Sequence, residues 1–231
     1  PRFDTSAKAL SVNTASGYYR KFRGLLAIAL RDKLLQENIN LYLDRIDVKP
    51  NKIEYLTQQE LLNLSKAPCE IPVLKKASLF SCLTGLRYSD VQRLEWRNIV
   101  PNLDRTGYNI RTRTKKTQAE ISLPLSPDAL ELCGERSDGV VFIGLNRNML
   151  NTPLRRWISE AGITKHITFH SFRHTYAVLQ LASGTDIYTV SKMLSHKHVT
   201  TTEIYLDLLE ETKSKTIGRI QIHKDHDPDA A

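Results

Sequence analysis

The stretch His170-Ser171-Phe172-Arg173-His174-Thr175 decides how the rest of the chain is interpreted. Residues three apart lie on one face of a helix, so His170 and Arg173 can converge on one small anion. Leu194-Ser195-His196 follows, and Tyr205 comes nine residues after that last histidine. Guanidinium forks, imidazoles and a phenol suit a phosphodiester that is held and attacked in place.

The composition is that of a basic globular protein. The chain has 231 residues, enough to bury a core for one large domain, or for one domain and a fragment. Lys and Arg number 33 against 25 Asp and Glu, and the net charge of +8 favours polyanionic partners without establishing a function. Three scattered cysteines without a Cys-x-x-Cys pair indicate reduced thiols. There is no apolar run long enough for a membrane span and no signal peptide, so we expect a cytoplasmic protein.

The N-terminal quarter predicts one amphipathic helix and a linker. Residues 1 to about 12 have the character of a loop or strand end. Apolar residues at three- and four-residue steps predict a helix from Thr14 to about Asn38, with a basic opposite face. The polar segment 44–52 contains a proline and has no apolar face, which predicts a linker.

The remainder predicts a mainly helical, α+β fold with one small antiparallel sheet. Thr57-Gln58-Gln59-Glu60 is a capping-box pattern, and Ser126-Pro127 and Asp186 are further helix starts. The helices are expected over 71–83, 88–94 and 146–161, over 170–182, from 186 to 194, and from Thr200 through Tyr205 to Leu209. The strands are expected over 108–113 and 120–123, joined by a basic turn, with a third within 96–100. Residues 216–222 alternate faintly, and the tail from Asp225 is expected to be disordered.

Taken together, these motifs resemble the tyrosine recombinases, the phage-integrase type of site-specific DNA strand-exchange enzyme. The matching residues stand in the family's order: Thr84-Gly85-Leu86-Arg87-Tyr88-Ser89-Asp90, Lys116, the 170–174 motif, Leu194-Ser195-His196 and Tyr205. The resemblance covers about Glu54 to Thr216 and is most similar to integrases of bacterial mobile elements. It implies a catalytic domain over 54–231 and, over 1–51, the last part of a helical core-type DNA-binding domain plus linker. We expect the first helices of that domain to precede residue 1.

The resemblance also implies how the phosphate is held and attacked. Arg87 and Arg173 would grip the non-bridging oxygens of the scissile phosphate, whose charge grows in the transition state. Tyr205 would attack phosphorus and form a 3'-phosphotyrosyl link. Lys116 would protonate the leaving 5'-oxygen, with the adjacent Lys115 as the alternative. Because the covalent link conserves the energy for religation, no cofactor and no metal are implied.

The remaining predicted roles belong to the histidines and one carboxylate. His170 would accept or relay the proton of the nucleophile, and His196 would donate a hydrogen bond to the phosphate. Asp90, one helical turn after Arg87, would orient that arginine. His170 and His174 have the spacing of zinc ligands, but a zinc-protease helix requires glutamate where Ser171 stands. His174 is interpreted as a core or supporting histidine that bonds to the backbone, with direct contact to the site as the alternative.

The predicted partner is double-stranded DNA, bound by a homotetramer on paired sites with accessory DNA-bending proteins. The predicted location is the bacterial cytoplasm, at the nucleoid when the protein is bound to DNA. Two alternatives stay open: relaxation of supercoils as by a type IB topoisomerase, and a relative that binds DNA without cutting it. Residues 216–222 either dock on a neighbouring subunit or fold back on their own domain.

Overall fold

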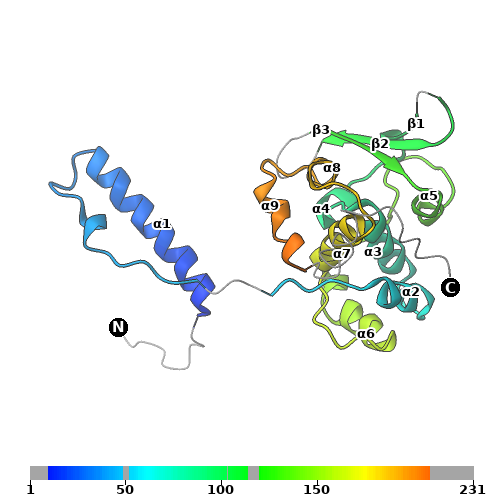
Figure 1. The fold of residues 1–231 in the computed structure, drawn as a ribbon, viewed down its shortest axis with the longest axis horizontal. Helices are drawn as coiled ribbons and strands as arrows, with labels where there is room; N and C mark the ends of the chain where they lie inside the picture. The colour runs from blue at the N-terminus through cyan, green and yellow to red at the C-terminus, as the bar shows by residue number, and fades with distance from the viewer. Residues whose placement is uncertain (1–9, 49–51, 103, 114–119, 209–231) are drawn as a thin grey trace, which may run out of the picture. The chain divides into compact units, whose positions relative to one another are not determined.

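The computed structural model describes residues 10–48, 52–102, 104–113 and 120–208 (Figure 1). By the density of contacts along the backbone, the chain divides into two compact units, Pro1–Lys52 and Ile53–Ala231. Assigning the first unit to a DNA-binding domain stays a prediction. The expected behaviour of residues 216–222 and of the tail from Asp225 lies outside the described residues.

In the first unit, helix α1 (Val12–Arg31) is followed by a 3-10 turn, η1 (Ile39–Leu41). The predicted end of the helix near Asn38 is wrong. Lys33 takes the left-handed φ of 59°, and the N–H of Leu34 turns back to the carbonyl of Ala29, which is how helices commonly end.

An arginine on α1 connects it to η1. Arg23 donates to the carbonyl of Asn40 over 3.1 Å, and the Asn40 side chain donates to the carbonyl of Arg23 over 3.0 Å. Part of the predicted basic face therefore holds this unit together.

The second unit is mainly helical with a three-stranded antiparallel sheet, which confirms the predicted fold class (Figure 1). The elements are α2 (Gln58–Lys66), α3 (Pro72–Thr84), α4 (Tyr88–Val91), η2 (Trp96–Asn98), β1 (Ile99–Pro101), β2 (Tyr108–Arg113), β3 (Glu120–Leu125), α5 (Pro127–Cys133), η3 (Arg147–Leu150), α6 (Thr152–Glu160), α7 (Phe169–Ala182), α8 (Ile187–Met193), α9 (Thr200–Glu203) and η4 (Leu206–Leu208).

The sheet has the order β1-β2-β3 and turns one apolar row inward. Ile99 pairs with Ile110, and Ile110 pairs with Leu123. Side chains alternate between the two faces of a strand, so these three residues share one face, where each is at most 1% exposed. The segment between β2 and β3 that is predicted to be a basic turn, with Lys115 and Lys116, lies outside the described residues.

Helices α3 and α7 pack side by side in the core, and α5 covers α3 (Figure 1). Phe80 of α3 and Phe172 of α7 are completely buried. Because this packing fixes the rotation of α7 about its axis, it also fixes where the polar residues of the 170–174 motif lie.

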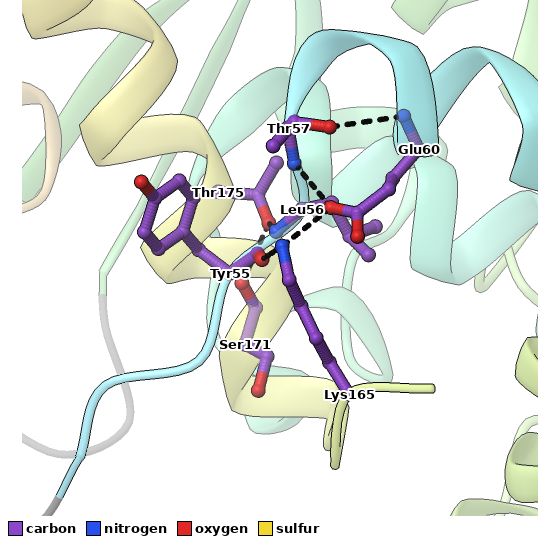
Figure 2. A network of polar contacts seen from close by, with 7 residues as sticks. All are labelled: Tyr55, Leu56, Thr57, Glu60, Lys165, Ser171 and Thr175. Carbon is purple, nitrogen blue, oxygen red and sulfur yellow. Dashed lines mark hydrogen bonds and ion pairs between the residues drawn. The ribbon is translucent and has the colours of Figure 1, made fainter. Parts of the chain in front are cut away.

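The entry to the second unit is tied to α7 by buried hydrogen bonds (Figure 2). The N–H of Leu56 donates to the hydroxyl of Thr175 over 2.9 Å, and that hydroxyl donates to the carbonyl of Ser171 over 2.9 Å. Nearby, Lys165 donates to the carbonyl of Tyr55 over 3.1 Å. The segment that leads into α2 is therefore held against the helix that carries the motif.

Three predicted helix starts are confirmed by their caps. Thr57 and Glu60 form the reciprocal capping box of α2. Ser126 accepts from the N–H of Ala129, and Asp186 accepts from the N–H of Thr189. Each cap satisfies N–H groups that have no partner within the first helical turn.

Two longer helices predicted from periodicity are interrupted in the structure. The segment 146–161 is split at Asn151, because Pro153 has no N–H to continue an earlier helix and instead suits the first turn of α6. The final helix ends at Glu203, so Tyr205 lies in a turn between α9 and η4. Smaller differences are that α4 ends at Val91 and that 96–98 is a 3-10 turn before β1.

Candidate active site

Arg173 lies at the centre of a buried polar cluster on α7. Its side chain is 3% exposed, Nη1 donates to the carbonyl of Gly85 over 2.7 Å, and Nη2 donates to the carbonyl of Leu194. Burial, and then the charge of Arg87, lower the pKa of Arg173 to about 10. The guanidinium stays charged at neutral pH and links α7 to the turns that carry Arg87 and His196.

The turn after α3 depends on Gly85. It has a φ of 67°, and a Cβ at this position would lie 2.6 Å from Tyr176 Cδ1 and 2.7 Å from Leu194 Cδ2. Only glycine combines this backbone conformation with so close an approach. The turn then delivers Arg87 to the N-terminus of α4.

Arg87 is half-buried and has an unsatisfied donor. Among the described residues, its Nη1 has no hydrogen-bond partner although it is buried. The charge of Arg87 also lowers the pKa of Arg173 and of His196, so the three groups share one electrostatic neighbourhood. An unpaired buried N–H is costly, and an incoming acceptor would remove that cost.

Asp90 follows Arg87 by one turn on α4 and is buried. Its Oδ1 lies 3.7 Å from Arg93 Nη2, and its negative charge acts to raise the pKa of Arg173. The carboxylate therefore faces the arginine cluster, and its predicted role in orienting Arg87 stays a prediction.

His196 is held by a threonine that the sequence analysis did not single out. It follows Ser195, whose φ is 52°, and its Nδ1 lies 2.8 Å from the hydroxyl of the fully buried Thr202. Burial, then the charge of Arg173 and Arg87, lower the pKa of His196 to about 4, so the ring is neutral at pH 7. The run of three threonines before Tyr205 was the available signal, but threonines at a helix start are normally only caps.

Tyr205 is 2% exposed and packs with residues of α7 and α8, including Val178 and Val190. Its hydroxyl lies 2.8 Å from Nδ1 of His174. Burial raises the pKa of Tyr205, and the charges of Arg173 and Arg87 oppose that rise. The phenol is therefore a neutral hydroxyl, held inside the cluster.

His174 follows the alternative interpretation, contact with the site, because its Nδ1 faces the Tyr205 hydroxyl and not a backbone group. Burial, then the charges of His170 and Arg173, lower the pKa of His174 to about 4. His170 is exposed, and its ring meets the His174 ring edge-on at 4.5 Å between centroids and 82° between planes. The geometry leaves His170 on the solvent side of this pair.

The structure brings five of the six predicted catalytic residues into one cluster: Arg87, His170, Arg173, His196 and Tyr205. The sixth, Lys116, and its alternative Lys115 lie outside the described residues. Within the described ranges, no three His, Cys, Asp or Glu side chains are grouped so that they could hold a metal ion. The catalytic roles themselves stay predictions.

Comparison with known proteins identifies the family of the second unit. A model described as the phage integrase family matches residues 54–212. The chain belongs to this family. Tyrosine recombinase XerD of Lacticaseibacillus casei is 28% identical, with 89% of this chain and 74% of the relative covered. XerC of Actinobacillus pleuropneumoniae serotype 7 is 26% identical over 54% of this chain and 44% of its own length.

Solved structures of recombinases share the fold of this phage integrase family member. The XerH site-specific recombinase bound to palindromic difH substrate superimposes with a TM-score of 0.67 at 19% identity, covering 91% of this chain and 69% of that one. A lambda integrase(75–356) dimer bound to a COC' core site superimposes with a TM-score of 0.63 at 22% identity, covering 82% of this chain and 75% of that one. The family match and the curated relatives confirm the predicted class, a tyrosine recombinase that cuts and rejoins DNA.

The helices in the described ranges of this family member include none that is both long and apolar enough to cross a bilayer. The cysteines Cys69, Cys82 and Cys133 are free thiols, as predicted.

Proposed function

We propose that this chain recombines double-stranded DNA at specific sites, and that Tyr205 forms a 3'-phosphotyrosyl link while a 5'-hydroxyl is released. One observation carries the proposal: the buried hydroxyl of Tyr205 lies in the same cluster as two guanidiniums and two neutral imidazoles. A phenol is a weak nucleophile at neutral pH, and phosphorus in a diester is shielded by negative charge. Cations that neutralise that charge beside the phenol address both problems.

The arginines have donors left for a phosphate. A guanidinium carries five N–H groups, and the carbonyls of Gly85 and Leu194 engage two of those on Arg173. Its other N–H groups, together with the unpaired Nη1 of Arg87, can donate to non-bridging oxygens. A phosphate bound there would be held by charge-assisted hydrogen bonds in a site where burial strengthens them.

The proton transfers use the remaining predicted residues. His196 donates from Nε2 to a non-bridging oxygen, which requires the Thr202 hydroxyl to donate to Nδ1. Lys116, or alternatively Lys115, protonates the leaving 5'-oxygen. Asp90 orients Arg87, and His170 relays the proton of the nucleophile toward solvent. No cofactor or metal takes part in this scheme.

The proposed assembly is a homotetramer on paired DNA sites in the bacterial cytoplasm, at the nucleoid when bound, with accessory DNA-bending proteins. Residues 1–51 contribute the end of a helical DNA-binding domain, and residues 54–231 form the catalytic domain.

The proposal is tested by trapping the covalent intermediate. The protein is incubated with a library of duplexes that have a randomised centre and a nick beside it. After cutting, the short fragment that carries the 5'-hydroxyl diffuses away because of the nick, so the covalent link cannot be religated. Electrophoresis after denaturation is expected to show a DNA-shifted protein band that Tyr205→Phe abolishes. Tyr188→Phe, at an exposed tyrosine, is the control and should retain the band. A band that persists in Tyr205→Phe would falsify the nucleophile assignment.

The trapped sequences also separate the alternatives. A recombinase enriches one site from the library and relaxes only plasmids that carry it, whereas a topoisomerase relaxes any supercoiled plasmid. A relative that only binds DNA gives retarded complexes and no covalent band.

A further inference from the structure

The hydroxyl of Tyr205 lies close to one imidazole nitrogen, Nδ1 of His174. The distance from Oη to Nδ1 is 2.8 Å, the rings lie 5.6 Å apart, and the phenol is almost completely enclosed. This is the separation at which a general base acts on the proton it removes. The resemblance to the recombinases supplied no role for His174.

We propose that His174 is the general base that takes the phenolic proton from Tyr205 during strand cutting, and that in its protonated form it gives a proton back to Tyr205 during religation. The inference rests on the proposed function and adds a catalytic residue to it. His170, whose ring lies edge-on against His174 and is exposed, exchanges protons between His174 and solvent in both directions.

The step balances as a direct displacement. The Oη–H bond of Tyr205 breaks and its proton moves to Nδ1 of His174, while Oη forms a bond to phosphorus. The bond from phosphorus to the 5'-oxygen breaks, and its electron pair leaves with that oxygen. The leaving oxygen takes a proton from the ammonium proposed for Lys116. No oxidant, reductant or metal is required.

The protonation states suit a base before the reaction begins. His174 is neutral at pH 7, because burial and the charges of His170 and Arg173 lower its pKa to about 4. The groups that face it are His170 and Arg173 on its own helix, Tyr205 from the turn before η4, and His196. A phosphodiester anion beside the guanidiniums would offset their charge and raise the pKa of His174 as the proton arrives.

The tautomer can be measured without any activity. In protein carrying 15N-labelled histidine, a base requires that Nδ1 of His174 show the nitrogen shift of an unprotonated acceptor, with the proton on Nε2. We expect Tyr205→Phe to shift that Nδ1 resonance. A protonated Nδ1 in the free wild-type protein would mean that the imidazole donates to the phenol, and it would overturn the inference.

The kinetic test uses His174→Asn, whose side-chain oxygen stands near the position of Nδ1 but cannot hold a proton. At neutral pH, we expect formation of the covalent band on the trapped duplex to slow by about 100-fold, the usual scale of general base catalysis. Unchanged binding of intact duplex and an unchanged midpoint of thermal unfolding would show that the variant is folded. His198→Asn, at an exposed histidine, is the matched control and should cut at the wild-type rate.

The pH profile separates a base from a packing residue. Wild-type cutting should be nearly flat from about pH 6 to 8, because neutral His174 is present throughout, well above its pKa. In His174→Asn the phenol must ionise unaided, so the rate should rise about tenfold per pH unit below the pKa of the tyrosine. His170→Asn should slow cutting but keep the flat profile.

Failure of this inference differs from failure of the proposed function. If His174→Asn cuts at the wild-type rate with a flat profile, the inference is wrong and the proposed function stands. If the wild-type protein forms no covalent band, or the band survives in Tyr205→Phe, the proposed function fails and the inference with it.

Discussion

Arg173 donates to the carbonyl of Gly85 across 88 positions of sequence, over 2.7 Å in the interior. The same guanidinium donates to the carbonyl of Leu194, so one side chain joins α7 to both turns that deliver the other cationic groups. A residue proposed to bind phosphate is therefore also part of the scaffold, whereas Nη1 of Arg87 has no hydrogen-bond partner among the described residues. The two arginines should respond differently to substitution.

Arg173→Lys is expected to lose both stability and cutting, and Arg87→Lys mainly cutting. A lysine cannot serve two carbonyls with the fixed fork of a guanidinium, and leaving one buried carbonyl unpaired costs about 1 to 3 kcal/mol. In Arg87 the buried Nη1 has no partner among the described residues that could be lost. Urea unfolding and band formation measure the two effects, and equal losses of stability would contradict the distinction.

Gly85→Ala should be more destabilising than another glycine substitution with the same backbone conformation. Gly162 has a φ of 73° and nothing within 4 Å of an added Cβ, so Gly162→Ala meets only the left-handed strain, about 1 to 2 kcal/mol. Gly85→Ala adds contacts of 2.6 and 2.7 Å with Tyr176 and Leu194. The midpoint temperatures of thermal unfolding of the two variants are compared. Equal values would show that the turn at Gly85 can relax around the added methyl group.

The sequence predicted what depends on local pattern. The capping box at Thr57, the caps at Ser126 and Asp186, and the antiparallel strands follow from residue types at short range. Periodicity failed where the backbone is decided by single residues, as at Lys33, where the first helix stops, and at Asn151, which precedes α6.

The polar cluster was predictable as a set of motifs but not as a network. The order of the motifs placed Arg87 and Arg173 together, yet no local pattern tells which atoms an imidazole will face. The contact of His174 with Tyr205 depends on the packing of α7 against the segment around η4, and the contact of His196 with Thr202 depends on the packing of α8 and its following turn against α9. Such contacts join residues by tertiary structure, and sequence spacing carries little information on them.

Thr202 should control His196 through its hydroxyl and not its size. If the hydroxyl donates to Nδ1, the neutral ring keeps its proton on Nε2, where it can reach a phosphate oxygen. Thr202→Val keeps the shape and removes the donor, so cutting should fall by about tenfold or more, in line with the loss of one hydrogen bond to a charged group. Thr202→Ser keeps the donor and should restore most of the rate. Equal rates in the Val and Ser variants would assign Thr202 to packing alone.

Acid should weaken the fold through Glu60, at the entry to the second unit (Figure 2). Burial acts to raise the pKa of this carboxyl, but the contact with Lys165 at 2.6 Å and the N–H of Thr57 at 2.7 Å outweigh burial and lower it. Because the pKa is lower in the folded state than its usual 4.5, the stabilisation is complete above that pH and is lost as pH falls through the folded value.

Glu60→Gln isolates this effect, because glutamine preserves the capping-box geometry without the charge. The wild-type protein should have the larger free energy of unfolding at neutral pH, and the difference should shrink as the pH falls below 4.5 and the carboxylate is protonated. When Lys165 is replaced by Met, the pH-dependent part of this difference in the free energy of unfolding should be smaller. Only the Thr57 contacts then favour the charged form of Glu60. Urea unfolding at several pH values measures all four proteins. A difference that stays constant down to pH 3 would show that the carboxylate contributes by shape and not by charge.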